Sequence, residues 1–325
     1  MSLFKKPSDL TAKPGIVAMV YGSPGSGKST IACSAPNAVM IDTDGGVMRI
    51  NGAHQIPTLQ VESWEQIVDA INEVKQTPEI ESVVIDTVGK MMSYMEDYMR
   101  RFPTMSKSGY LEFNRDGSLS QKGYGRRKLM FNDFIKSITV LGKNVIFVAH
   151  DKEEKRGDDV VLRPEVGGSS TNDLMKELDL VGYMEMVNNV RTISFTPSDR
   201  FYAKNTCDMP GIIPIPVLIN DKKEIVGENK FFGEVIANYR NRINENIANN
   251  RKLEDLKELI FSNVEEIKNA EDANNFVSWV NGLEHVYNSK AIAGKALLAK
   301  AKELGLKFDK ASKTYSNPES DGSAA

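Results

Sequence analysis

The sequence contains little of what builds a disulfide scaffold or a metal centre. Its 325 residues include two cysteines, Cys33 and Cys207, and three histidines, at positions 54, 150 and 285. Neither set has the spacing of a zinc site or of a redox motif. The cysteines are therefore interpreted as isolated thiols, which favours a reducing, intracellular setting.

Long apolar segments and a strong net charge are lacking as well. No apolar run reaches the roughly 18 residues that a membrane-spanning helix needs. The N-terminal segment MSLFKKPSDLTAKPG has no apolar stretch of the kind found in a signal peptide. The formal net charge is −3, so no overall positive field points to nucleic acid. No G-x-S-x-G motif is present that would indicate a serine nucleophile.

Short apolar runs recur along the first part of the chain and predict strands. They lie at 15–22, 37–44, 82–89 and 144–150. Segments with helical spacing of apolar residues lie between them, as at 63–75, where Ser63 is a candidate N-cap. Alternating strands and helices predict an α/β fold with a mainly parallel sheet.

The pattern changes after about residue 232, where asparagine becomes frequent and apolar residues recur only at helical intervals. This change predicts a small helical appendage behind the α/β part. We expect an N-terminal arm (1–14), an α/β core (15–232), a helical C-terminal region (233–315) and a disordered tail (316–325).

A phosphate-binding motif lies between the first predicted strand and a helix. The segment Gly22–Ser29 matches G-x-x-x-x-G-K-[ST], a P-loop. Its glycines let backbone N–H groups surround a phosphate, and the helix N-terminus adds positive potential. We expect Lys28 to reach the β- and γ-phosphates of ATP and the Ser29 hydroxyl to bind Mg²⁺. The expected nucleotide contacts are Gly22, Ser23, Pro24, Gly25, Ser26, Gly27, Lys28, Ser29 and Thr30.

Carboxylates follow two further predicted strands. Asp86 ends the apolar run Val83-Val84-Ile85, the place of a Walker B residue, and is expected to hold Mg²⁺ directly or through water. Asp42 and Asp44 both lie at the end of the strand after the P-loop helix, and either could orient the attacking water. Asp44 could instead belong to an Asp-Gly-Gly turn.

A basic stretch at 100–128 is a candidate DNA-binding surface. It holds eight lysines and arginines against Glu112 and Asp116, a net charge of +6, with aromatic residues between them. Cations that contact phosphates and rings that stack on bases are typical of single-strand binding. A solvated insertion is the alternative. The expected DNA contacts are Lys122, Tyr124, Arg126, Arg127 and Lys128, with Arg156 and Arg163 in a second charged loop at 151–170.

The order of these segments resembles the RecA recombinase superfamily: a P-loop, then strands that end I-D-T-D, V-V-I-D-T and V-I-F-V-A-H. The resemblance covers about residues 15–220 and implies a RecA-like P-loop NTPase core. It makes Asp44 the catalytic carboxylate and places His150 where the family has a γ-phosphate sensor, usually glutamine. It also implies that the loop after His150 contacts DNA and that Lys204 reaches the nucleotide of a neighbouring protomer. The implied catalytic residues are Lys28, Asp44, Asp86, His150 and Lys204.

Within this superfamily, D-T-D-G-G after the P-loop helix and the segment F-Y-A-K-N look like phage-encoded, single-domain proteins that promote single-strand annealing. This resemblance implies a DNA-dependent ATPase that uses ATP and Mg²⁺ in the cytoplasm of a host cell. Its partners would be single-stranded DNA, further copies of itself in a filament or ring, and a single-strand-binding protein, with no membrane. Its physiological act would be annealing or homologous recombination. A nucleotide-gated DNA-binding module with little turnover and a small-molecule or nucleotide kinase stay open as alternatives.

Overall fold

A computed structural model of the chain describes residues 4–11, 15–106, 109–110, 112–157, 159–168, 170–220, 222 and 224–318. The chain divides into two compact units, Lys13–Arg240 on the one hand and Met1–Ala12 with Asn241–Ala325 on the other. The boundary expected near residue 232 falls inside the first unit. Residues 319–325 of the expected tail lie outside the described residues.

One sheet forms the centre of the first unit. Its strand order is β12–β10–β9–β1–β7–β4–β2–β3, and β8 pairs with β7 and β11 with β9. The parallel strands are β1 (Val17–Gly22), β2 (Ala38–Asp42), β3 (Thr58–Gln60), β4 (Ser82–Asp86), β7 (Asn144–Arg156) and β9 (Leu180–Val187). The antiparallel strands are β8 (Asp159–Pro164), β10 (Val190–Ser194), β11 (Lys204–Asn205) and β12 (Ile212–Pro214). The predicted α/β fold with a mainly parallel sheet is confirmed.

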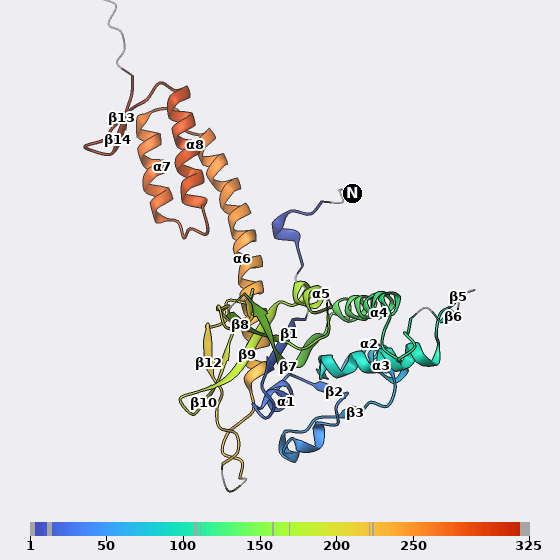
Figure 1. The fold of residues 1–325 in the computed structure, drawn as a ribbon. Coiled ribbons are helices and arrows are strands. Elements are labelled where there is room, and N and C mark those ends of the chain that lie inside the picture. Colours follow the sequence, from blue (N-terminus) through green and yellow to red (C-terminus); the bar gives the residue numbers. More distant parts are fainter. Residues whose placement is uncertain are drawn as a thin grey trace, which may run out of the picture. The chain divides into compact units, whose positions relative to one another are not determined.

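Helices cover both faces of this sheet (Figure 1). On one face lie α2 (Trp64–Gln76), α3 (Val88–Arg101), α4 (Gln121–Thr139) and α5 (Ser170–Glu177). On the other lie α1 (Lys28–Ala32) and the first part of α6 (Phe231–Glu265). Because both faces are covered, the middle parts of the central strands, 17–21, 83–85 and 145–149, are apolar on both faces. Ser63, Thr87 and Ser120 each cap a helix by accepting a hydrogen bond from a first-turn N–H.

The register of the parallel strands brings their carboxyl ends together. Gly22 of β1 lies opposite His150 of β7, and Asp42 of β2 lies opposite Asp86 of β4. Ligands of open α/β sheets bind at this edge. The polar residues that follow the apolar runs in sequence therefore meet in space.

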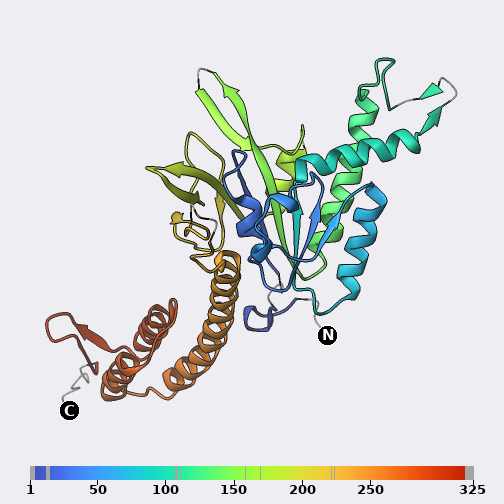
Figure 2. The ribbon, with the colours of Figure 1, turned by 90° about the horizontal axis from the view of Figure 1, so that it is seen from below.

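Short elements fill the connections. They are the 3₁₀ turns η1 (Pro7–Asp9), η2 (Val47–Arg49) and η3 (Gly52–His54) and the two-residue strands β5 (Met105–Ser106) and β6 (Gly109–Tyr110). Phe201 forms an isolated bridge to Leu162 ahead of β11. Figure 2 shows β7 continuing past the body of the sheet as a hairpin with β8.

The second unit is helical, as predicted. The later part of α6 packs with α7 (Ala270–Gly282) and α8 (Ser289–Glu303), and a hairpin of β13 (Lys307–Asp309) and β14 (Thr314–Ser316) follows α8 (Figure 1). Leu256, Ile260, Phe276, Val280 and Leu297 form its apolar core. The hairpin was not predicted from the sequence.

Candidate functional site

The P-loop connects β1 to α1 as its motif predicts. A Cβ atom on Gly22 would lie 2.3 Å from the carbonyl oxygen of Met184 on β9, so only glycine allows this approach. Gly27 caps α1 with a φ of 95°, which also favours glycine. The loop backbone is thus shaped around the N-terminus of α1.

The Lys28 ammonium lies at the centre of this loop. Its side chain is 5% exposed, and Nζ donates to the carbonyl oxygens of Gly22 and Ser23, both at 2.8 Å. Burial lowers the pKa of Lys28, and Asp86, Asp151 and Asp44 oppose that shift. Nζ also donates to Ser26 Oγ at 3.4 Å. A buried cation whose hydrogen bonds all go to uncharged oxygens is suited to an anionic ligand.

Asp86 and Ser29 meet beside Lys28. Asp86 is 3% exposed at the end of β4. Burial raises its pKa to about 6, although hydrogen bonding from Ser29 lowers it. The charge of Lys28 lowers this pKa only in part, and Asp44 and Asp42 raise it, so a divalent cation would add the charge that favours the ionised carboxylate. Hydroxyl and carboxylate oxygens are the donors that Mg²⁺ prefers, together with phosphate oxygens. These two residues fit Mg²⁺.

No larger metal cluster accompanies this pair. Across the described residues, no group of three or more histidine, cysteine, aspartate or glutamate side chains could hold a metal ion. A Mg²⁺ ion shared between two protein oxygens and a triphosphate does not need such a group.

The structure separates the roles of Asp42 and Asp44. Asp42 is 2% exposed, and its carboxylate accepts from the backbone N–H groups of Gly46 at 2.9 Å and Val47 at 3.0 Å. It therefore closes the turn after β2. The buried Oδ1 atom of Asp44 accepts no hydrogen bond within the described residues. A guanidinium nitrogen of Arg49 lies 3.7 Å from this atom, which is longer than a hydrogen bond, so Asp44 keeps hydrogen-bonding capacity that Asp42 has already used.

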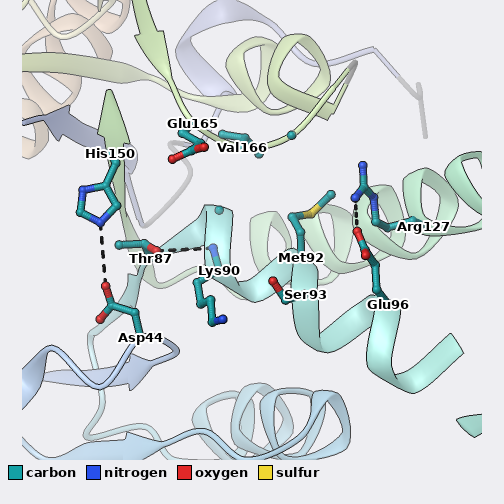
Figure 3. A pocket seen from close by; sticks show the side chains of 12 residues that line it. Asp44, Thr87, Lys90, Met92, Ser93, Glu96, Arg127, His150, Glu165 and Val166 are labelled. Atoms are coloured by element: carbon teal, nitrogen blue, oxygen red, sulfur yellow. Dashed lines mark hydrogen bonds and ion pairs between the residues drawn. The ribbon is translucent and has the colours of Figure 1, made fainter. Parts of the chain in front are cut away.

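His150 of β7 faces Asp44, which follows β2 on the far side of β4 (Figure 3). Its Nε2 lies 3.9 Å from Oδ2 of Asp44. Its buried Nδ1 has no hydrogen-bond partner in the described part of the chain. His150 lies opposite Gly22 of the P-loop, and both His150 and Asp44 line the cavity that contains the P-loop residues, so both side chains are within reach of its ligand.

Two cavities meet at Asp44, Thr87 and His150. The first, of about 330 Å³, contains the P-loop residues Pro24, Gly25, Gly27, Lys28, Ser29 and Thr30 together with Asp86. It also contains Arg49 and Arg191, which sequence reasoning missed because no motif marks them. The second, of about 420 Å³, runs between α3 and the loop 165–167 as far as Glu96 and Arg127 (Figure 3).

Acids pair with three cations of the basic stretch at 100–128, so fewer of them are available than its net charge indicates. Ion pairs join Arg126 to Glu112 at 2.9 Å, Lys128 to Asp173 at 2.9 Å, and Arg127 to Glu96. The net charge of +6 counted only acids inside the segment, whereas Glu96 and Asp173 come from α3 and α5.

The other expected DNA contacts divide into two groups. Arg163 pairs with Glu154 at 2.7 Å, so it is engaged like the arginines of α4. Lys122 and Tyr124 are exposed on the first turn of α4. The Arg156 side chain, and Lys107 in the basic stretch, lie outside the described residues.

Lys204 contacts its own protomer. Its Nζ donates to the carbonyl oxygens of Met175 and Lys176, both at 3.2 Å, at the end of α5. It lies opposite Val181 of β9, which pairs with Met19 of β1, three positions before Gly22. These contacts give Lys204 a helix-capping position, and its role at a neighbour's nucleotide stays a prediction.

Among the described helices, none combines the length and the apolar character needed to cross a membrane.

Comparison with known proteins identifies the family to which the core belongs. No curated protein matches the chain. A family model described as an AAA domain matches residues 15–207, a stretch that holds the P-loop, Asp44, Asp86 and His150. The match covers more than half of the chain, so the protein belongs to this AAA-domain family of P-loop NTPases, whose members bind and hydrolyse nucleotides.

Proposed function

We propose that the protein is a Mg²⁺-dependent ATPase in which Asp44 orients the attacking water. The observation that carries this proposal is the buried Oδ1 of Asp44, which accepts no hydrogen bond in the described residues and lines the same cavity as Lys28, Ser29 and Asp86. The water attacks the γ-phosphorus, and the bond from that phosphorus to the β–γ bridging oxygen breaks. ADP and phosphate leave, and the water proton passes through Asp44 to solvent.

Each neighbouring residue has a distinct part in this scheme. Lys28 contacts the phosphate oxygens once they replace the carbonyls to which Nζ now donates. Ser29 and Asp86 hold Mg²⁺, which supplies positive charge to the phosphates when bound. His150 donates to the γ-phosphate or to the Asp44 carboxylate, because its Nε2 lies 3.9 Å from Asp44 and its Nδ1 has no hydrogen-bond partner in the described residues.

Two substitutions test the site. Lys28→Ala is expected to abolish nucleotide binding or turnover without unfolding the protein. Asp44→Asn should lower turnover by roughly 100-fold or more, the scale of a lost general base, and leave the affinity for a fluorescent ATP analogue almost unchanged. Wild-type turnover in a folded Lys28→Ala or Asp44→Asn protein would refute the assignment.

We further propose that this ATPase works on single-stranded DNA as a homo-oligomer and promotes annealing or recombination, with a single-strand-binding protein as a candidate partner. The RecA-like order of motifs supports this proposal. So does the continuity of β7, in which His150 and the hairpin beyond the sheet belong to one strand. Glu165 N–H also donates to the His150 carbonyl at 2.8 Å, so the hairpin's return is tied to the same residue. A ligand that moved the hairpin would therefore act on the nucleotide site.

The ATPase rate with and without single-stranded DNA tests this coupling, and light scattering with ATP and DNA tests assembly. Strong stimulation and a larger assembly are expected. If the ATPase rate does not change when DNA is added, the DNA role is refuted and only the proposed hydrolysis of ATP remains. DNA binding without measurable turnover would favour the nucleotide-gated module.

The second cavity favours one alternative, phosphoryl transfer to a small molecule. It adjoins Asp44 and contains donors and acceptors, including Lys90, Ser93 and Glu165. Its volume far exceeds the space that one water needs. With γ-labelled ATP, an ATPase releases the label as inorganic phosphate, whereas a kinase leaves it on an acceptor added from a metabolite pool.

A further inference from the structure

Charge is segregated along the helical C-terminal unit. Residues 254–284 contain eight acids and two lysines, a net charge of −6, whereas residues 289–318 contain seven lysines and two acids, a net charge of +5. The second segment consists of α8 and the β13–β14 hairpin. A basic surface of this kind is not visible in the total charge of the protein, which is −3.

Five of these seven lysines form no ion pair with a described residue. Side-chain ion pairs in this unit join Lys252 to Glu284, Lys257 to Glu254, and Lys300 to Glu303. Lys290, Lys295, Lys302, Lys310 and Lys313 are exposed and form no ion pair with any described residue. The cations of α4 are the opposite case, since acids from other elements pair with them.

The outward face of α8 presents lysines on small residues. Ala293, Leu297 and Ala301 face the core. Lys295 and Lys302, seven residues and two turns apart, share the exposed face. A Cβ atom on the neighbouring Gly294 would meet no atom within 4 Å, so the fold itself does not require glycine there. A glycine inside a helix costs about 1 kcal/mol relative to alanine, and here it leaves room for another chain.

The turn of the hairpin adds two lysines, Lys310 and Lys313, and the strand before it adds an exposed ring. The Asp309 carboxylate accepts from the N–H groups of Ala311 at 2.6 Å and Ser312 at 3.4 Å, and these bonds lower its pKa. The acid is thereby engaged in the turn that carries Lys310 and Lys313. Phe308 is 49% exposed on the adjoining strand.

We propose that α8 and the β13–β14 hairpin bind the phosphate backbone of single-stranded DNA, with Phe308 placed to stack on a base. Unpaired lysines beside an exposed ring are the components of single-strand binding surfaces. An interfacial membrane helix needs a broad apolar face, and the exposed face of α8 offers Leu298 among alanines and lysines. The inference rests on the proposed DNA function but places DNA on a unit outside the AAA domain.

The test compares charge-neutralised full-length proteins by their salt-dependent affinity for oligothymidylate. The two variants are Lys295→Gln/Lys302→Gln and Lys310→Gln/Lys313→Gln. Each lost phosphate contact lowers the log–log salt slope by about 0.7, so each variant should lose about 1.4 and bind roughly 25-fold more weakly at 0.1 M salt. The control Lys257→Gln/Lys268→Gln makes the same change in net charge on the acidic segment and should leave the slope unchanged. ATPase activity without DNA should be unchanged in all three.

The outcomes separate this inference from the function on which it rests. Wild-type protein that binds DNA, with unaltered slopes in both lysine variants, refutes the basic surface alone. Wild-type protein that does not bind DNA refutes both proposals. Equal losses in the control and the test variants would show a global charge effect and also overturn the inference. If the lysine variants lost binding to polyglutamate and kept their affinity for DNA, the surface would be assigned to an acidic protein instead.

Discussion

Asp86→Asn should make the nucleotide-free protein more stable while it removes a Mg²⁺ ligand. The carboxylate is almost completely buried, and its pKa in the folded protein is about 6 against an ordinary value of 3.8. The folded state therefore disfavours the ionised form. An asparagine at the same place carries no charge to desolvate.

The magnitude and its pH dependence follow from these two pKa values. A difference of about two pKa units corresponds to roughly 3 kcal/mol. Below about pH 4 the carboxyl is protonated in both folded and unfolded chains, and the two proteins should be equally stable on this account. Because the folded pKa is raised, wild-type protein loses stability relative to Asp86→Asn as the pH rises from about 4 to about 6, and the full difference persists above that.

The assay is urea unfolding of both proteins with a chelator and without nucleotide, at several pH values in this range. Asp42→Asn is the matched control, because Asp42 accepts from two backbone N–H groups. Its amide NH₂ would face one of them, at a cost of about 1–3 kcal/mol. Asp86→Asn should therefore raise the free energy of unfolding, whereas Asp42→Asn on the adjacent strand should lower it. The reasoning would be refuted if Asp86→Asn were less stable than wild type at neutral pH. It would also be refuted if the difference in the free energy of unfolding did not change with pH.

Three further substitutions test contacts that surround the site. Arg126→Ala should lower the free energy of unfolding by about 2 kcal/mol, because the Glu112 side chain, which is 4% exposed, loses its ion pair. The control Lys122→Ala should change it little, and equal effects of the two substitutions would contradict the pairing. Gly89→Ala places a Cβ 2.5 Å from the Glu165 carbonyl oxygen, so both thermal stability and ATPase rate should fall. Wild-type values would show that α3 can move away from the loop at Glu165 without loss of stability or activity. Lys204→Ala should cost about 1 kcal/mol through α5 and spare ATP hydrolysis; lost turnover with unchanged stability would support the role at a neighbouring protomer.

Much of the nucleotide site could be predicted because its determinants are local. The P-loop is a contiguous motif, and its strand and helix are neighbours in sequence, so Lys28 and Ser29 could be placed without tertiary information. Asp86 was found because a strand buried on both faces is an unbroken apolar run, and its end is visible as the first charge. The same periodicity predicted the mainly parallel sheet and the helical C-terminal region.

What only the tertiary structure decided depends on contacts between residues far apart in sequence. Asp42 and Asp44 look alike in the chain, and the turn that engages Asp42 became visible only with the backbone N–H groups of Gly46 and Val47 in place. From the sequence alone, Arg127 and Lys128 were interpreted as available cations. In the fold, α3 and α5 place Glu96 and Asp173 beside them. A charge count along the sequence cannot include partners that folding brings from other elements, because Coulomb interactions depend on distance in space.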